Sequence, residues 1–227
     1  MNRRTFLKAV PAVTLLAGAK PGLGQELKTI ELVEPQREGG KSVLEALWER
    51  KTTRNIGTEK LPAQMLSNLL WAAFGINRPN EPYRGPGRTA ASASNSQEID
   101  LYVALAEGVY LYEAKEHHLI PVAAGDFRRR SGRRTAARAP VNIFYVVDIA
   151  KYAKAPFQEP GLKNPEVQKS YYYVATGLIA SNVYLFAASQ DLAAHFHNCD
   201  KRSTPKEFKL RPDQRVLFSQ TVGYPEG

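Results

Sequence analysis

Residues 166–192 place the strongest constraint on the fold. Tyr171, Val174, Leu178 and Ser181 recur at intervals of three and four, which is the spacing of one face of a helix. Most of the other positions are also apolar or small: Tyr172, Ala175, Ile179, Ala180, Val183 and Phe186. Because a helix that is apolar nearly all round must be buried nearly all round, we predict a helix shared with a second copy of the chain. Three small residues on this helix would let the helix of the second copy approach closely: Gly177, Ala180 and Ser181.

Four segments have the composition of strands. Residues 98–105 predict one strand, and residues 108–122 predict a hairpin of two more. Residues 141–147 are nearly continuously apolar, which predicts a central strand covered on both faces. Residues 215–225 predict a last strand that ends in a turn.

Two short helices precede these strands. The first begins at a capping box, Ser42-x-x-Glu45, and has an apolar face. That face consists of Val43, Leu44, Leu47 and Trp48. The second helix follows Pro62, carries apolar residues at helical spacing up to Phe74, and ends at Gly75.

A basic turn separates the two helices. Arg50, Lys51 and Arg54 lie there with the hydroxyl groups of Thr52 and Thr53 between them. Guanidinium groups and hydroxyls donate hydrogen bonds to phosphate oxygens, so the turn is a candidate phosphate site. The alternative is that the basic residues only complement the C-terminus of the first helix.

A second candidate site lies in the small, polar run at residues 88–97. Small residues let backbone amides approach a flat ligand, and serine, asparagine and glutamine supply directional hydrogen bonds. The alternative is a flexible surface loop. His195, His197 and Cys199 would share one face of a later strand, but no further ligand accompanies them, and we predict no metal site.

The N-terminus has the order of an export signal, with basic, short apolar and small residues in succession. Arg3 and Arg4 followed by x-Phe-Leu-Lys resemble the bacterial twin-arginine signal. We therefore expect export of the folded protein to the periplasm or beyond through the twin-arginine machinery. The apolar stretch is too short to span a bilayer, so no stable membrane anchor is expected. The predicted organisation is a signal at 1–24, an arm at 25–40 and one domain at 41–227.

Charge is unevenly distributed along the chain. The net charge is +9, of which the four basic residues of positions 1–24 contribute four, leaving +5 for the rest. This mild excess argues against a dedicated nucleic-acid-binding protein. Residues 126–138 nevertheless contain six arginines, which predict either a solvated surface or contact with an anionic partner.

Taken together, these segments resemble the nitroreductase family of flavin enzymes, over roughly residues 41–225. The motifs arrive in the family's order: the basic turn at 50–54, the small polar segment at 91–97, Ala-Pro-Val at 139–141, the long helix, and Val-Gly-Tyr-Pro at 222–225. Residues 70–77 and 108–112 look most like the subgroup that includes azoline dehydrogenases of modified peptides. The resemblance implies an α+β fold with a mixed, mainly antiparallel sheet between helices, and a homodimer joined through the long helix.

The resemblance also implies FMN at the dimer interface. The phosphate and the polar edge of the flavin would be bound by Arg50, Lys51 and Arg54, with Thr52 in place of the usual serine. Residues of the partner subunit would lie along the flavin: Ser92, Ala93 and Asn95, with Gln97 beside them. Residues 193–195 would occupy the place of a glycine-rich flavin contact. Ser94 replaces the usual glycine, and no basic residue follows the last strand.

Three functions remain open from the sequence. The first is an exported FMN oxidoreductase that works by a ping-pong cycle on a small quinone, nitro or enone compound, with NAD(P)H or another donor. The second is an azoline-type dehydrogenase acting on modified peptides, and the third is a non-catalytic flavin-binding protein. No side chain is identified as a catalytic acid or base.

Overall fold

The computed structural model describes residues 26–81 and 85–226. The predicted export signal at 1–24 lies outside these residues and stays a prediction. Within the described residues, no helix is both long and apolar enough to cross a membrane.

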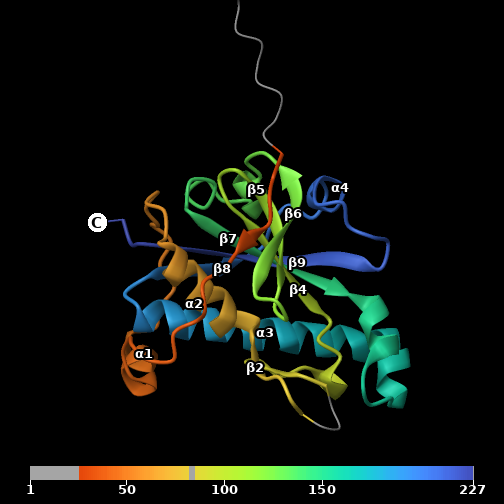
Figure 1. The fold of residues 1–227 in the computed structure, drawn as a ribbon. Helices are drawn as coiled ribbons and strands as arrows, with labels where there is room; N and C mark the ends of the chain where they lie inside the picture. Colours follow the sequence, from red (N-terminus) through yellow and green to blue (C-terminus); the bar gives the residue numbers. More distant parts are fainter. Residues whose placement is uncertain (1–25, 82–84, 227) are drawn as a thin grey trace, which may run out of the picture.

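A seven-stranded sheet forms the centre of the molecule (Figure 1), in the order β1-β6-β5-β4-β7-β9-β8. Each neighbouring pair in it is antiparallel. The strands are β1 (Ile30–Glu31), β4 (Ile99–Ala104), β5 (Gly108–Glu113), β6 (His118–Ala124), β7 (Val141–Asp148), β8 (Ala193–His197) and β9 (Gln214–Gly223). A separate ribbon pairs β2 (Ile76–Arg78) with β3 (Gly87–Arg88). The predicted α+β class is confirmed.

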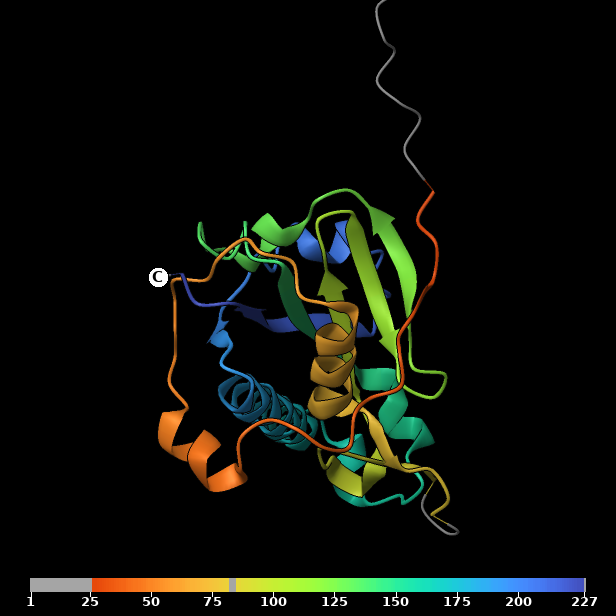
Figure 2. The same cartoon turned by 60° about the vertical axis from the view of Figure 1, so that its left-hand side comes forward.

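Helices lie around the sheet, as Figures 1 and 2 show. They are α1 (Val43–Glu49), α2 (Ala63–Phe74), α3 (Pro165–Ser189) and α4 (Thr204–Glu207). Short 3₁₀ turns are η1 (Ala93–Asn95), η2 (Arg128–Ser131), η3 (Ile149–Lys154) and η4 (Pro160–Lys163). The main apolar core joins α2 and α3 to one face of the sheet, whereas Phe208, directly after α4, packs on the other face.

Strand β7 has the burial that its apolar run predicts. All eight of its residues are buried. Ile143 and Tyr145 belong to the core under α2 and α3, while Phe144 and Val146 belong to the cluster on the opposite face. The predicted central strand, covered on both sides, is therefore confirmed.

Helix α3 is buried on one side only within a single chain. Tyr172, Ala175, Ile179 and Val183 enter the core, together with Ala180, which was expected to face a second copy. The opposite side presents Tyr173, Val174 and Leu178, of which Val174 is 62% and Leu178 is 43% exposed. The helix ends at Ser189, three residues earlier than predicted, because Gln190 caps it and Asp191 has a positive φ of 56°.

Helix α1 also presents its apolar face to solvent within one chain. Val43, Leu44, Leu47 and Trp48 are all exposed, and Trp48 is 90% exposed. Only Ala46 of this helix is buried. Two apolar helix faces thus remain uncovered in the described chain.

Candidate functional site

Lys41 connects α1 to the C-terminal end of α3. The predicted capping box is present, because Glu45 N donates to Ser42 Oγ and Ser42 N donates to a Glu45 carboxylate oxygen. The ammonium group of Lys41 contacts Glu49 at 2.5 Å and also contacts Asp191. Lys41 N donates to Ser189 O at 3.0 Å. The basic turn that follows α1 therefore starts from a fixed position.

Tyr184 on α3 connects the basic turn to β8. Its hydroxyl accepts a hydrogen bond from Phe196 N at 2.8 Å and lies 3.1 Å from Thr52 Oγ1. The guanidinium of Arg50 lies over its ring, 5.5 Å from the centroid. Thr53 N donates to Ala194 O at 3.0 Å. Sequence reasoning missed Tyr184, because no local pattern links it to a turn more than a hundred residues away.

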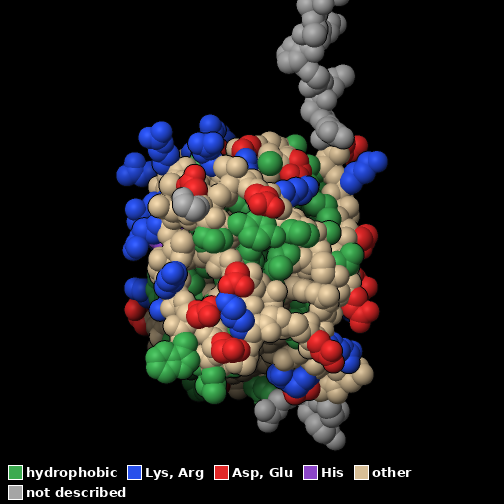
Figure 3. Space-filling view, turned by 90° about the vertical axis from the view of Figure 1, so that its left-hand side faces the viewer, with side chains coloured by type: hydrophobic (Ala, Val, Ile, Leu, Met, Phe, Trp, Pro, Cys, Tyr) green, Lys and Arg blue, Asp and Glu red, His purple; other side chains and the backbone are tan. Residues whose placement is uncertain are grey.

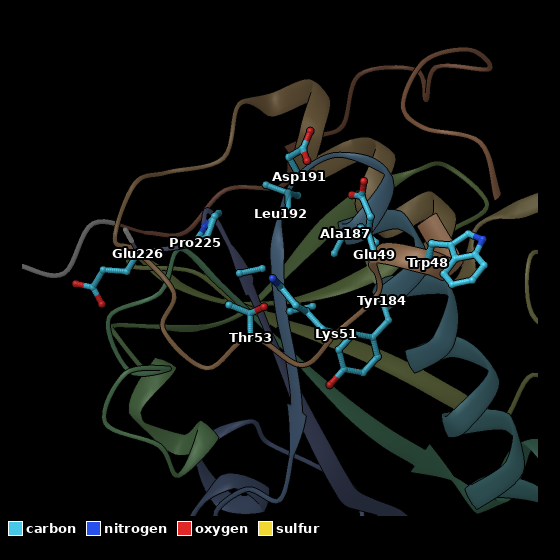
Figure 4. Close-up of a pocket in the computed structure, with 13 residues that line it drawn as sticks. Trp48, Glu49, Lys51, Thr53, Tyr184, Ala187, Asp191, Leu192, Pro225 and Glu226 are labelled. Atoms are coloured by element: carbon cyan, nitrogen blue, oxygen red, sulfur yellow. The ribbon is translucent and has the colours of Figure 1, made fainter. Parts of the chain in front are cut away.

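A cavity of about 620 Å³ opens beside this turn. It is lined by Trp48, Glu49, Lys51, Thr53, Tyr184, Ala187, Ala188, Asp191, Leu192, Ala193, Ala194, Pro225 and Glu226. Figure 4 shows Lys51, Thr53 and Tyr184 in its middle, with Trp48 and Glu226 at opposite sides. The volume falls in the range of small-molecule and cofactor sites.

The charges around the cavity are partly compensated. Glu49 and Asp191 share Lys41 as a partner. Arg50, Lys51 and Arg54, by contrast, have no ion pair with any carboxylate of the described chain. These three cations are therefore available to an anionic ligand.

The positive charge of Arg54 acts on His195, one of two neighbouring buried histidines. His195 and His197 lie on the same side of β8, as predicted, with ring centroids 4.7 Å apart. Burial, together with His197, Arg54 and Arg133, lowers the pKa of His195 to about 4. Arg133 comes from the arginine-rich segment, which sequence reasoning did not connect with this site. In the described part of the chain, no group of three or more His, Cys, Asp or Glu side chains could hold a metal ion.

The depressed pKa of His195 predicts a loss of stability in mild acid. In the unfolded chain His195 is protonated below about pH 6.5, whereas in the folded chain it is protonated only below about pH 4. The stabilisation is present above pH 6.5 and is lost as the pH falls toward 4. We expect His195→Gln to reduce the difference in unfolding free energy between pH 7 and pH 5 by on the order of 1–2 kcal/mol, measured by urea titration. An identical pH dependence in both proteins would contradict this assignment.

The small polar segment is an ordered turn rather than a flexible loop. Gln97 N donates to Ser92 Oγ at 3.0 Å, and the Gln97 amide donates to Asn95 Oδ1 at 2.9 Å. Arg88 Nε donates to Gln97 Oε1 at 2.6 Å. Ser94 has a φ of 52°, in the left-handed region where glycine is favoured, which accounts physically for a glycine at this place in similar sequences.

The structure does not bring the two predicted halves of the site together within one chain. Ser92, Ser94 and Asn95 line a separate cavity of about 270 Å³, which shares no residue with the cavity beside Lys51. Figures 1 and 2 both show α1 and the segment of η1 apart from each other. Arg50, Lys51, Thr52 and Arg54 thus lie at one place, and Ser92, Ala93, Asn95 and Gln97 at another.

Comparison with known proteins agrees with this architecture. A model of the nitroreductase family matches residues 47–224. The chain belongs to the nitroreductase family. Enzymes of this family are generally FMN-dependent oxidoreductases that are usually dimeric and typically use NAD(P)H as donor.

Three relatives illustrate the range of similarity. A crystal structure of a nitroreductase-family protein from Ralstonia eutropha JMP134 is 32% identical, with a TM-score of 0.79, and the match covers 92% of this chain and 94% of that one. A nitroreductase-family protein of Methanocaldococcus jannaschii is 26% identical over 171 residues, which are 72% of this chain and 81% of the relative. A chain of the E. coli microcin synthetase complex, 17% identical with a TM-score of 0.64 over 99% of this chain and 85% of that one, shares the fold.

Proposed function

We propose that this nitroreductase-family protein is an FMN-dependent oxidoreductase that binds FMN between two copies of the chain. The observation that carries the proposal is the separation of two complementary half-sites. One half offers three unpaired cations beside a large cavity, and the other offers an ordered small turn. A ligand that touches both halves must lie between two copies, because one chain keeps them apart.

The residues present fit FMN. Its phosphate needs cations, and Arg50, Lys51 and Arg54 are unpaired and exposed. Its flat ring needs close backbone approach, which the short side chains of Ala193 and Ala194 allow in the wall of the cavity. We assign the phosphate and the polar edge of the flavin to the basic turn. The η1 segment of the second copy, with Ser92, Ala93, Asn95 and Gln97, is assigned to the ring.

The apolar faces of α1 and α3 support a homodimer. Exposed contiguous apolar surface on a soluble protein marks an interaction site, and Trp48, Val174 and Leu178 all lie on such faces. Gly177 lies within the α3 stripe, and a methyl group placed on it would meet no atom within 4 Å. A second α3 can therefore approach closely at this point.

In the mechanism, bound FMN supplies the electron transfer, by a ping-pong cycle in which donor and acceptor react in turn. The protein binds and orients the cofactor through the basic turn, which Tyr184 holds against β8. His195 is neutral at pH 7 because its pKa is about 4, so it is not a proton donor there. We assign no catalytic acid or base.

The substrate class follows from the cofactor and from the expected location. A small quinone, nitro or enone acceptor suits an open cavity of this size. If the signal at 1–24 directs export to the periplasm, a donor other than NAD(P)H is required where nicotinamide nucleotides are scarce. The second candidate is an azoline-type dehydrogenase, which is favoured by the sequence of residues 70–77 and 108–112 and by the shared fold of the microcin synthetase chain.

The first experiment is to purify the protein and record its absorbance between 350 and 500 nm, roughly the flavin range. Acid release and chromatography identify any cofactor. Titration of the apoprotein with FMN then measures affinity, and turnover with NADH, NADPH and reduced quinones tests the donor. A colourless protein that takes up no FMN would exclude both enzymatic functions and leave a non-catalytic member of the fold.

Replacing Arg54 by alanine tests the assignment of the basic turn. A charge-assisted hydrogen bond contributes about 1.5–3 kcal/mol, so FMN affinity is expected to fall roughly 10- to 150-fold. Titration with riboflavin, which lacks the phosphate, separates the phosphate contact from ring contacts. Arg37→Ala removes an arginine that is also exposed, from the N-terminal arm, and is the control. Equal FMN affinity in both variants would mean that the phosphate binds elsewhere.

A further inference from the structure

The excess positive charge of the folded domain is concentrated in two segments. Residues 126–138 and 200–209 together hold ten basic and three acidic residues, a net charge of +7. Residues 25–227 as a whole carry +5, so the remainder outside these segments carries −2. The molecule is therefore strongly polarised, with one basic region and a mildly acidic remainder.

Arg128 and Arg130 pair with all the acidic residues of the two segments, and Arg130 joins one segment to the other. Arg128 pairs with Asp126 at 2.7 Å. Arg130 pairs with Asp200 at 3.1 Å and also contacts Glu207. Asp200 N donates to the backbone oxygen of Arg130 at 2.9 Å. The two segments are thus fixed side by side, and no acidic residue within them remains to neutralise their other cations.

The remaining cations form what we call the basic patch. All eight are exposed, and none has an ion pair with a carboxylate of the described chain. They are Arg129, Arg133, Arg134, Arg138, Lys201, Arg202, Lys206 and Lys209. Both segments lie at the upper end of the molecule in the views of Figures 1 and 2, and Figure 3 shows Lys and Arg side chains gathered at the upper left of one face.

The surroundings of the basic patch limit what it can bind. None of the large hydrophobic side chains that are exposed in the described chain lies in its two segments. Contact through the patch is therefore electrostatic, without insertion of apolar side chains. Arg133 of the patch lies near the candidate site, because the charges of Arg133 and Arg54 both lower the pKa of His195.

We propose that the basic patch docks the protein on the surface of an anionic phospholipid membrane. Clusters of four to eight basic residues are typical of surfaces that bind anionic lipid headgroups. Arginine, which supplies all four cations of the first segment, pairs with phosphate in a bidentate manner. A planar membrane contacts only one end of the molecule, so it does not contact the acidic remainder. A long flexible polyanion would also contact that remainder and be repelled by it, which favours the membrane.

Docking gives the candidate site a defined position. The edge of the site at Arg54 and Arg133 faces the headgroups, where a lipid-dissolved quinone would arrive. This link to a quinone rests on the proposed function, whereas docking itself does not.

Vesicle sedimentation tests the proposal on the full chain. The probes are vesicles of phosphatidylcholine alone and of phosphatidylcholine with about one-third phosphatidylglycerol, at low and high salt. Arg129→Gln, Arg134→Gln and Arg138→Gln are combined in the patch variant. Lys28→Gln, Lys154→Gln and Lys163→Gln, at exposed positions outside the patch, are combined in a control variant with the same loss of charge.

Wild type and the control variant are expected to bind the anionic vesicles, and to lose this binding in high salt, where charges are screened. The patch variant is expected to bind roughly 100-fold more weakly, since each cation near an anionic surface contributes about fivefold. Replacing the same three arginines by lysine should keep most of the binding, because lysine retains the positive charge that the glutamine substitutions remove. Equal binding by the patch and control variants, or equal binding to neutral vesicles, would overturn the proposal.

Two further readouts separate this proposal from its alternatives. If the patch variant loses affinity for a fluorescent DNA duplex but not for anionic vesicles, the patch serves a nucleic acid and membrane docking is wrong. The flavin absorbance of each variant is recorded in parallel. A colourless protein that docks would reject only the proposed function, and a yellow protein that does not dock would reject only the docking.

Discussion

Replacing Leu178 by aspartate is expected to convert the protein into monomers that no longer retain FMN. Leu178 is 43% exposed within one chain and lies next to Val174 on the uncovered side of α3. In a two-fold dimer each substitution occurs twice in the interface. An unpaired buried charge costs about 3–5 kcal/mol, so two weaken the dimer by roughly 10⁴-fold or more. FMN is lost because each of its proposed half-sites comes from a different chain.

Light scattering coupled to size-exclusion chromatography measures the oligomeric state, and absorbance of the same peak measures bound flavin. Lys169→Gln is the control, since it also lowers the charge by one but lies on the same helix away from the Val174–Leu178 stripe. Circular dichroism verifies that both variants are folded. A Leu178→Asp protein that remains dimeric and yellow would place the interface on another surface and would contradict the proposed half-sites.

Phe208→Ala is expected to destabilise the fold by about 3–5 kcal/mol, the usual cost of removing a buried aromatic ring. Phe208 is 0% exposed. Its ring centroid lies 4.9 Å from that of Phe144 and 5.9 Å from that of Tyr102, and it also contacts Phe127. It therefore joins the arginine-rich segment and the segment after α4 to the far face of the sheet.

Urea unfolding of wild type and variant at equal protein concentration measures this loss, since an oligomer's stability depends on concentration. Val33→Ala, at a side chain that is 43% exposed, is the control and should change stability by less than about 0.5 kcal/mol. A loss below about 1 kcal/mol for Phe208→Ala would mean that neighbouring rings fill the space.

Much of the fold could be predicted because burial leaves local patterns. The apolar run at 141–147 predicted β7, and the structure buries it on both faces. The capping box at Ser42 and the glycine after Phe74 predicted where α1 begins and α2 ends. Each signal lies within a few residues of the element that it describes. The end of α3 was placed three residues too late, because Gln190 to Leu192 keep the helical spacing although the backbone turns there.

The candidate site could be predicted only in pieces. The basic turn and the small polar segment stand out by composition. Their fixed geometry depends on partners distant in sequence, such as Tyr184 for Thr52 and Arg88 for Gln97. His117, at the turn between β5 and β6, is half-buried, and its ring contacts Ser67 Oγ at 2.7 Å and Tyr112 OH at 3.0 Å. No pattern in the sequence around His117 predicts either contact.

Local spacing and composition predicted the strands and the apolar helix faces, because each reports the burial of neighbouring residues. The order of the motifs gave the resemblance to the nitroreductase family, which the family model over residues 47–224 then confirmed. The folded chain was needed to show that α3 is covered on one side only, and that the basic turn and η1 stay apart within a chain. It also showed that Arg130 joins the two segments of the basic patch, while eight cations of the patch form no ion pair with a carboxylate of the described residues. These features arise from contacts between segments far apart along the chain, and no periodicity specifies which segments meet.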